Sequence, residues 1–174
     1  MLITFKNHTP KVGQNVLICD GAKIIGEVEI AENASIWYNC VLRGDVNYIK
    51  IGKNTNVQDL TTIHVWHRES GKEDSGYPTI IGDNVTIGHN CIIHACTIED
   101  NCLIGMGSIV MDGARIGTNS IVGAGAVVTK GKTFPPNSLI LGNPAKFVRE
   151  LKQDEIEEIA NSAIRYVKFK NEYL

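Results

Sequence analysis

Apolar residues recur at every sixth position through most of this sequence. A helix repeats its buried positions every 3.6 residues and a strand every two, so neither element alone produces a period of six. Short strands joined by turns produce it, and a single such unit cannot bury its own apolar side. The units must therefore stack on one another as a solenoid. The repeating positions are Val12, Ile18, Ile24, Ile30, Ile36, Leu42, Ile51, Val57, Ile63, Ile81, Ile87, Ile93, Ile98, Ile104, Val110, Ile116, Val122 and Val128.

This pattern resembles that of the hexapeptide-repeat proteins, which fold as a left-handed parallel β-helix. In that fold three hexapeptides form one triangular coil, and successive coils stack. The resemblance implies an all-β solenoid, and it alone supplies the left-handed sense, because ordinary parallel crossovers are right-handed. We predict that the repeat occupies residues 1–148. Residues 65–79 are a polar insertion that we expect to loop out of one corner.

The repeat ends in the proline-containing stretch 134–144, and an amphipathic helix is predicted after it. Asp154 and Glu157 have the spacing of a helix capping pattern. We expect a C-terminal helix within residues 149–174 that packs alongside the solenoid as part of the same domain. Its apolar stripe is Ile156, Ile159, Ala160, Ala163 and Val167.

Composition argues against several classes of partner and location. The formal net charge of −2 gives no basic field for nucleic acid or an anionic membrane. No apolar run approaches the roughly 20 residues of a membrane span, and the N-terminus lacks a signal-peptide pattern. The five cysteines form no C-x-x-C pair, which favours small buried residues over disulfides. These features predict a cytoplasmic protein.

Assigning successive hexapeptides to three faces gives each repeat a place on the triangle. The segments that begin at Leu42, Ile63 and Ile93 fall on one face, which we call face one. Face two holds the segments at Ile51 and Ile81, and face three those at Val57 and Ile87.

Three of the five histidines fall on positions that can converge. His64 and His94 each follow the apolar residue of a face-one segment, one coil apart. Stacked strands lie about 4.8 Å apart, so both imidazoles can reach one zinc-type ion. His89 lies on face three, above Asp59 of the preceding coil. In a threefold trimer, face three of one subunit can meet face one of its neighbour, which would complete a three-histidine site.

The same residues resemble the gamma-class carbonic anhydrase family. The matching motifs are LRGDVNYIKIGKNTNVQD (42–59), His64, IGHNCIIHAC (87–96) and LGNPAK (141–146). The resemblance covers nearly the whole chain. It implies a homotrimer with a metal at each interface, bound by His64 and His94 of one subunit and His89 of its neighbour. The metal is expected to be zinc, with iron or cobalt as alternatives.

The resemblance also implies roles for residues around the metal. Gln58 would position the metal-bound water or bicarbonate. Arg43, Asp45 and Asp59 would form interface ion pairs and hold the ligands in place. Tyr166 matches a tyrosine near the metal in this family, although it could equally be a packing residue.

Two features depart from the family pattern. Active members carry glutamate directly after Arg-Gly-Asp, where this chain has Val46. They also carry a glutamate-bearing loop thought to shuttle protons, and none of Glu69, Glu73 and Asp74 in the insertion aligns with that role. His67, in the same insertion, is a weaker candidate for proton transfer.

We therefore predict a metal-dependent lyase that hydrates CO2 reversibly to bicarbonate, with metal-bound hydroxide as the nucleophile at trimer interfaces. One alternative is an acyl-CoA transferase or thioesterase, the common chemistry of hexapeptide-repeat proteins, with a histidine base at the interface. A second alternative is a metal-binding protein with little anhydrase activity, which the valine at position 46 favours.

Overall fold

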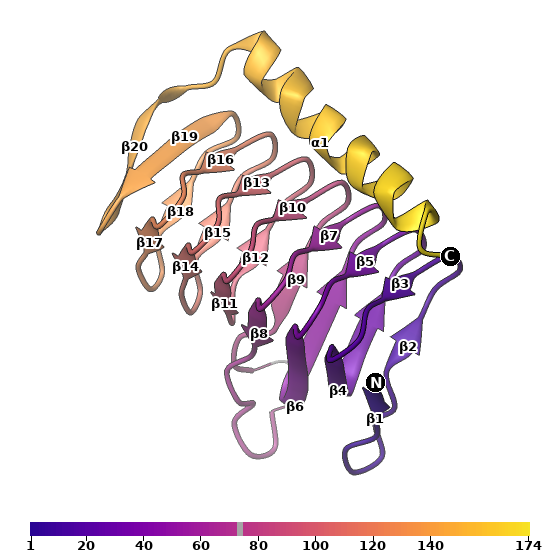
Figure 1. Ribbon diagram of the computed structural model, residues 1–174. Coiled ribbons are helices and arrows are strands. Elements are labelled where there is room, and N and C mark those ends of the chain that lie inside the picture. Colours follow the sequence, from indigo (N-terminus) through magenta and orange to yellow (C-terminus); the bar gives the residue numbers. More distant parts are fainter. Residues whose placement is uncertain (73–74) are drawn as a thin grey trace.

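The protein is a left-handed parallel β-helix with one helix along its side, as the resemblance to hexapeptide-repeat proteins implies (Figure 1). The computed structural model describes residues 1–72 and 75–174. Its coils stack so that each short strand pairs in parallel with the equivalent strands of the coils before and after it.

Each row of stacked strands forms one face of the triangle. Face one contains β1 (Leu2–Ile3), the first halves of β4 (Lys23–Ile30) and β6 (Val41–Ile51), β8 (Thr62–His64), β11 (Ile92–His94), β14 (Ile109–Val110) and β17 (Val127–Val128). Face two contains β2 (Lys11–Val12), the second halves of β4 and β6, β9 (Thr79–Ile81), β12 (Thr97–Ile98), β15 (Arg115–Ile116) and β18 (Thr133–Phe134). Face three contains β3 (Leu17–Ile18), β5 (Ser35–Ile36), β7 (Asn56–Val57), β10 (Thr86–Ile87), β13 (Leu103–Ile104), β16 (Ile121–Val122), β19 (Ser138–Gly142) and β20 (Ala145–Glu150).

Strand register confirms the assignment of segments to faces. Ile63 pairs with Leu42 on one side and with Ile93 on the other, so all three lie on face one. The pairing continues to the ends of β8 and β11, where His64 stands opposite His94. The repeating apolar side chains point inward, and those of Ile63 and Ile93 are fully buried. All five cysteines are free and buried, four of them in this interior and Cys19 in a separate cluster with Leu17 and Trp37.

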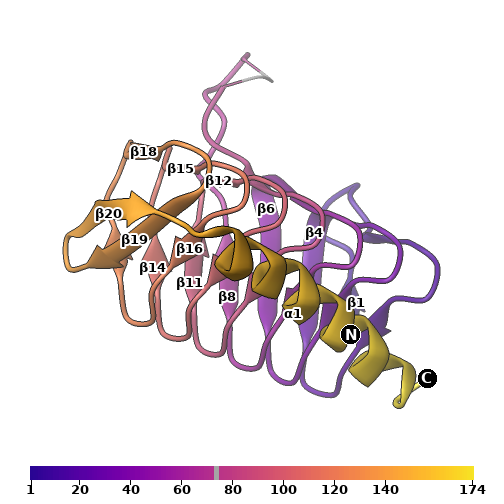
Figure 2. The same cartoon turned by 90° about the horizontal axis from the view of Figure 1, so that it is seen from above.

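Helix α1 (Gln153–Asn171) runs along the stack and packs against β5, β7 and β10 of face three (Figures 1 and 2). Ile159 and Ala163 of the predicted stripe are buried against this face. The predicted cap at Asp154 and Glu157 is wrong. The carboxylate of Glu155 instead accepts a hydrogen bond from the backbone N–H of Lys152, at 2.8 Å, so the helix begins at Gln153.

The insertion leaves the corner between faces one and two and projects from the solenoid (Figure 2). It is one residue shorter than predicted, because Thr79 already belongs to β9. A β-bridge between Trp66 and Tyr77 closes its base. Glu73 and Asp74 lie outside the described residues. Within the part of the chain that the structure describes, no helix is long and apolar enough to span a membrane.

Candidate metal centre

The imidazoles of His64 and His94 face each other at the corner between faces one and two. Nδ1 of His64 lies 3.1 Å from Nε2 of His94, because β8 and β11 pair in register up to these two residues. Two nitrogen ligands bound tetrahedrally at about 2.0–2.1 Å from zinc lie roughly 3.3 Å apart. The pair is therefore already close to the spacing that one metal ion requires.

The outer nitrogen of each imidazole is held by a carboxylate. Nε2 of His64 lies 3.0 Å from Oδ1 of Asp45, and Nδ1 of His94 contacts Oδ1 of Asp112. An ionised carboxylate only accepts hydrogen bonds, so each neutral ring donates its single N–H outward. The two facing nitrogens then both carry lone pairs, an arrangement that a shared cation stabilises. Carboxylates behind histidine ligands orient the rings in the same way in known metal sites.

Burial of the His64 ring favours its neutral, metal-binding form. Burial lowers the pKa of His64, and the nearby guanidinium of Arg43 adds to the effect, although Asp45 opposes it. Burial by itself would raise the pKa of Asp45, but hydrogen bonds from His64 and Arg43 outweigh it and lower that pKa. Arg43 forms an ion pair with Asp45 within the chain and so keeps this carboxylate ionised behind His64.

Thr79, the first residue after the insertion, ties the two histidine strands together. Its fully buried hydroxyl donates to the carbonyl oxygen of His64 at 2.5 Å and accepts from the backbone N–H of Ala95 at 2.9 Å. Ala95 directly follows His94 and has a φ of +52°, a left-handed conformation that is costly for a residue with a Cβ. Thr79 therefore holds the turn that fixes where the His94 side chain leaves β11.

Replacing Thr79 by valine should destabilise the protein and loosen the histidine pair. Valine keeps the shape but removes the hydroxyl, and leaving buried backbone groups poorly satisfied costs about 1–3 kcal/mol. We expect the free energy of unfolding, measured by urea titration at fixed protein concentration, to fall by that amount, and metal affinity to fall with it. Thr79→Ser retains the hydroxyl and should stay near wild type in metal affinity. Equal metal affinity in the Thr79→Val and wild-type proteins would contradict a role of the Thr79 hydroxyl in positioning the histidine pair.

His89 lies in the turn after β10, at the corner where face three ends and face one begins. The pair of His64 and His94 lies at the opposite end of face one. Asn90, with a φ of +56°, forms this turn, and its N–H donates to the carbonyl oxygen of Asp59 at 2.9 Å. Nδ1 of His89 lies 2.8 Å from Oδ2 of Asp59, as their stacking predicts, and about half of the His89 side chain is exposed. In residues 1–72 and 75–174 of one chain, no three His, Cys, Asp or Glu side chains converge on a common metal position. The chain thus brings together His64 and His94, but not His89.

Gln58 and Tyr166 lie on the His89 side of the molecule. The side-chain amide of Gln58 donates to Oδ1 of Asn56 at 3.2 Å, and Asn56 in turn donates to the hydroxyl of Thr86 at 2.9 Å. The Thr86 hydroxyl lies 3.1 Å from that of Ser162 on α1, so a buried polar chain connects Gln58 to the helix.

Tyr166 on α1 and His89 line one pocket of about 300 Å³ together with Asp59 and Trp37. The ring of Tyr166 also packs edge-on against Trp37, at 5.7 Å between centroids. Burial raises the pKa of Tyr166, and the negative charge of Asp59 adds to the rise. Tyr166 therefore packs in an aromatic cluster and also lies at a pocket that contains the third histidine.

Asp112 and Thr79 are functional candidates that the sequence motifs do not include. Asp112 lies on the coil after His94, outside all the matching motifs. Only its position in the repeat could have indicated it. Ile93 pairs with Val110, so Asp112 lies on the next coil, one residue past the position opposite His94. Val46 lines a pocket of about 290 Å³ with His67 and with Asp45, the carboxylate behind His64.

Stacked coils of six-residue repeats define a hexapeptide-repeat protein. In agreement, the family model described as bacterial transferase hexapeptide (six repeats) matches residues 9–44, 78–108 and 95–130. The crystal structure of a hexapeptide transferase family protein from Anaplasma phagocytophilum superimposes with a TM-score of 0.92, at 43% identity over 100% of this chain and 98% of that one.

Proteins similar in sequence indicate which group of hexapeptide-repeat proteins this chain belongs to. A probable carbonic anhydrase from Methanocaldococcus jannaschii is 52% identical over 90% of this chain and 94% of its own length. Gamma carbonic anhydrase 2, a mitochondrial protein of Arabidopsis thaliana, is 44% identical over 95% of this chain. The match spans only 59% of that plant protein's length. This chain belongs to the gamma carbonic anhydrase-like family of hexapeptide-repeat proteins.

Proposed function

We propose that this protein binds a divalent metal ion between neighbouring copies of the chain and hydrates CO2 there to bicarbonate and a proton. The observation that carries the proposal is the pair of facing ring nitrogens of His64 and His94, 3.1 Å apart, each backed by a carboxylate. His89 would supply the third ligand from the adjacent subunit. Three histidines and one open position are typical of a catalytic zinc site.

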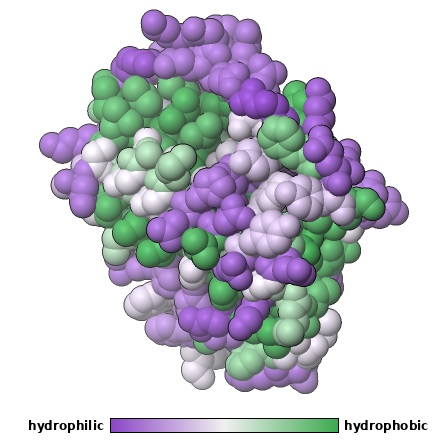
Figure 3. Space-filling view, viewed as in Figure 1, coloured by the Kyte–Doolittle hydropathy of each residue, from purple (hydrophilic) through white to green (hydrophobic). Residues whose placement is uncertain are grey.

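The surface along face one supports association of three copies. Its two ends carry the two parts of the centre, so a threefold ring joins each histidine pair to a neighbour's His89. Exposed apolar side chains accompany each part: Leu60 and Met106 near His89, Ile92 on β11, and Val46 and Trp66 near the pair. Large exposed apolar side chains gathered on one face are typical of a protein interface. Figure 3 shows the molecule in the orientation of Figure 1, where apolar and polar surface are mixed.

The residues present fit zinc, and iron or cobalt as alternatives, because imidazole nitrogen suits all three metals. When bound, the metal supplies the Lewis acidity that makes a water molecule reactive near neutral pH. Binding requires neutral histidines, and the lowered pKa of His64 keeps its ring neutral to lower pH.

The chain's own residues orient the metal ligands and accept the proton that hydration releases. Asp45 and Asp112 hold the N–H groups of His64 and His94, and Asp59 fixes the ring of His89. We assign Gln58 to positioning bicarbonate, since its amide is oriented by the buried chain to α1. Val46 cannot accept a proton. His67, which lines the same pocket as Asp45, is the group that we assign to accept it.

Stopped-flow measurement of CO2 hydration tests the proposal. We expect the zinc- or iron-loaded protein to accelerate hydration above the buffer rate, and His94→Ala, loaded under the same conditions, to give only the buffer rate. Lys132→Ala is the control, because Lys132 is exposed and lines neither the pocket at Val46 nor the pocket at His89, and it should hydrate CO2 like wild type. A wild-type rate equal to buffer, with metal occupancy confirmed by elemental analysis, would refute the proposed activity.

Acyl transfer or hydrolysis from CoA stays the alternative prediction. A panel of acyl-CoA thioesters assayed with the same variants separates the two activities. Turnover of a thioester that is lost in His94→Ala, together with no CO2 hydration, would favour the alternative. The cytoplasmic location also stays a prediction, which fractionation of the producing cell tests.

A further inference from the structure

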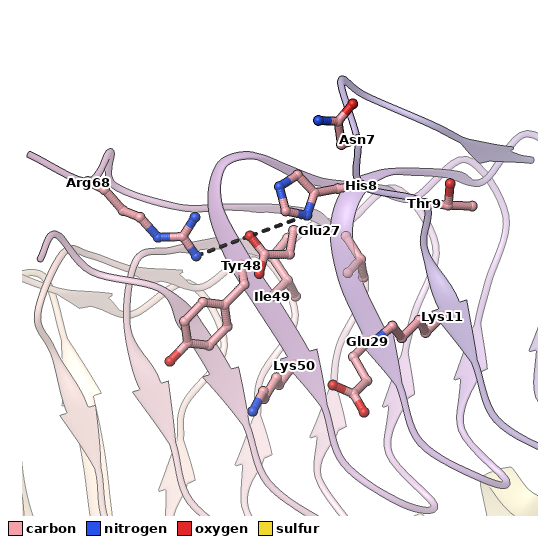
Figure 4. A pocket seen from close by; sticks show the side chains of 11 residues that line it. Asn7, His8, Thr9, Lys11, Glu27, Glu29, Tyr48, Ile49, Lys50 and Arg68 are labelled. Carbon is pink, nitrogen blue, oxygen red and sulfur yellow. Dashed lines mark hydrogen bonds and ion pairs between the residues drawn. The ribbon is translucent and has the colours of Figure 1, made fainter. Parts of the chain in front are cut away.

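A large polar pocket lies over face two, outside the candidate metal centre (Figure 4). It has a volume of about 780 Å³, within the range of small-molecule sites. Three parts of the chain form it: the N-terminal turn with His8, the face-two halves of β4 and β6, and Arg68 of the insertion. It shares no residue with the histidine pair or with the pocket at His89, and it adjoins the smaller pocket at Val46, with which it shares His8, Glu27 and Arg68.

The ring of Tyr48 is flanked by two cations in this pocket. The guanidinium carbon of Arg68 lies 5.7 Å from the ring centre, and Nζ of Lys50 lies 5.4 Å from it. Both cations therefore lie beside the same wall of the pocket. Within the described part of the chain, Arg68 has one carboxylate partner, Glu27, and a bound anion beside the ring would neutralise positive charge that the pocket leaves uncompensated.

The hydrogen-bonding capacity of these cations is mostly unused. Nη2 of Arg68 donates to Glu27 at 3.1 Å, but its Nε is buried and has no hydrogen-bond partner among the described residues. Buried donors are normally satisfied, so an unsatisfied one indicates a partner that the chain itself does not supply. Lys11 and Lys50 form no ion pair within residues 1–72 and 75–174, although Glu29 stands between them in strand register. The three cations outnumber the two carboxylates, Glu27 and Glu29, that line the pocket.

We propose that this pocket binds a small molecule through an oxyanion group, a phosphate or a carboxylate, that interacts with the cations beside the Tyr48 ring, Arg68 and Lys50. Charge-assisted hydrogen bonds from arginine and lysine are the usual means of binding both groups. Asn7, Thr9 and Glu29 line the rest of the pocket and suit hydroxyl or amine groups of the same ligand. The pocket stands mainly on face two, whereas the proposed contact between subunits follows face one.

Isothermal titration calorimetry of the full-length protein with inorganic phosphate, and separately with acetate, tests the site at constant ionic strength. We expect saturable binding of at least one anion, one per chain. Lys50→Gln and Arg68→Gln should each weaken the affinity at least tenfold. Lys50→Gln is the decisive variant, because Lys50 makes no ion pair within the described chain and its loss should not disturb the fold. Circular dichroism verifies the fold of both variants.

Two controls separate this site from other sources of anion binding. Lys132→Gln removes an exposed lysine elsewhere on the solenoid and should leave the affinity unchanged. His94→Ala disrupts the proposed metal centre and should also leave it unchanged, whatever becomes of the CO2 hydration activity. No saturable binding of either anion, equal weakening in Lys132→Gln, or loss of binding in His94→Ala would each overturn the proposal. Stronger binding of phosphate or of acetate identifies the ligand's acidic group.

Discussion

Replacing His89 by alanine should remove the metal as completely as replacing His94, although the two residues lie on different sides of one chain. Losing a carboxylate behind a histidine ligand typically costs 10–100-fold in metal affinity, and losing the ligand itself should cost more than about 100-fold. We expect elemental analysis of the purified variants to find little zinc or iron in either one. CO2 hydration should fall to the buffer rate in both.

Mixing the two variants gives the sharper result. A His89→Ala chain keeps its histidine pair, and a His94→Ala chain keeps its His89. In a mixed trimer, one interface can therefore join an intact pair to an intact His89. We expect co-expressed variants to recover metal and hydration activity that neither variant has alone. Matched double-variant chains, with both substitutions in each chain, should recover nothing. Absence of recovery in mixed trimers verified by mass spectrometry would contradict a shared site.

Replacing Asp112 by asparagine should lower metal affinity by about 10–100-fold while leaving the fold intact. The ring N–H of His94 now donates to the Asp112 carboxylate, which fixes the tautomer that leaves Nε2 free toward His64. Asparagine offers a weaker acceptor, and its amide can also turn a donor toward the ring. The metal-binding form of His94 is then less favoured.

Competition against a chelator of known affinity measures this effect. Asp154→Asn is the matched control, because it removes an exposed carboxylate on the first turn of α1 and should leave metal affinity unchanged. We also expect CO2 hydration by Asp112→Asn to recover when excess metal is supplied, since His64, His89 and His94 remain. An unchanged affinity in Asp112→Asn would show that this carboxylate does not support the ligand.

Some features of the centre could be predicted from sequence because the repeat fixes which residues of successive coils become neighbours. Strands one coil apart pair in register, so counting hexapeptides placed His64 beside His94 and Asp59 beneath His89. The helix stripe was equally readable, because burial of Ile159 and Ala163 follows from helical spacing alone. The start of the helix could not be predicted in the same way. Several acidic residues lie in its first turn, and the capping contact is made by Glu155 and not by Asp154 and Glu157.

Asp112 and Thr79 escaped prediction for a different reason. Backbone conformation decides which corner residue turns its side chain toward a neighbouring coil. The positive φ of Ala95 is an example, and the six-residue repeat does not predict it. The polar chain from Gln58 to Ser162 likewise joins residues more than 100 positions apart, through the packing of α1 on face three.

The sequence by itself determined the solenoid, the three faces and the separation of His89 from the histidine pair. A six-residue period leaves one way to bury its apolar side chains, and stacking then fixes which residues become neighbours. Only the tertiary structure decided how each ring is held: the 3.1 Å approach of His64 to His94, the carboxylates of Asp45 and Asp112 behind them, and the Thr79 hydroxyl between their strands. Those contacts depend on side-chain direction and turn geometry, which arise only when the coils pack.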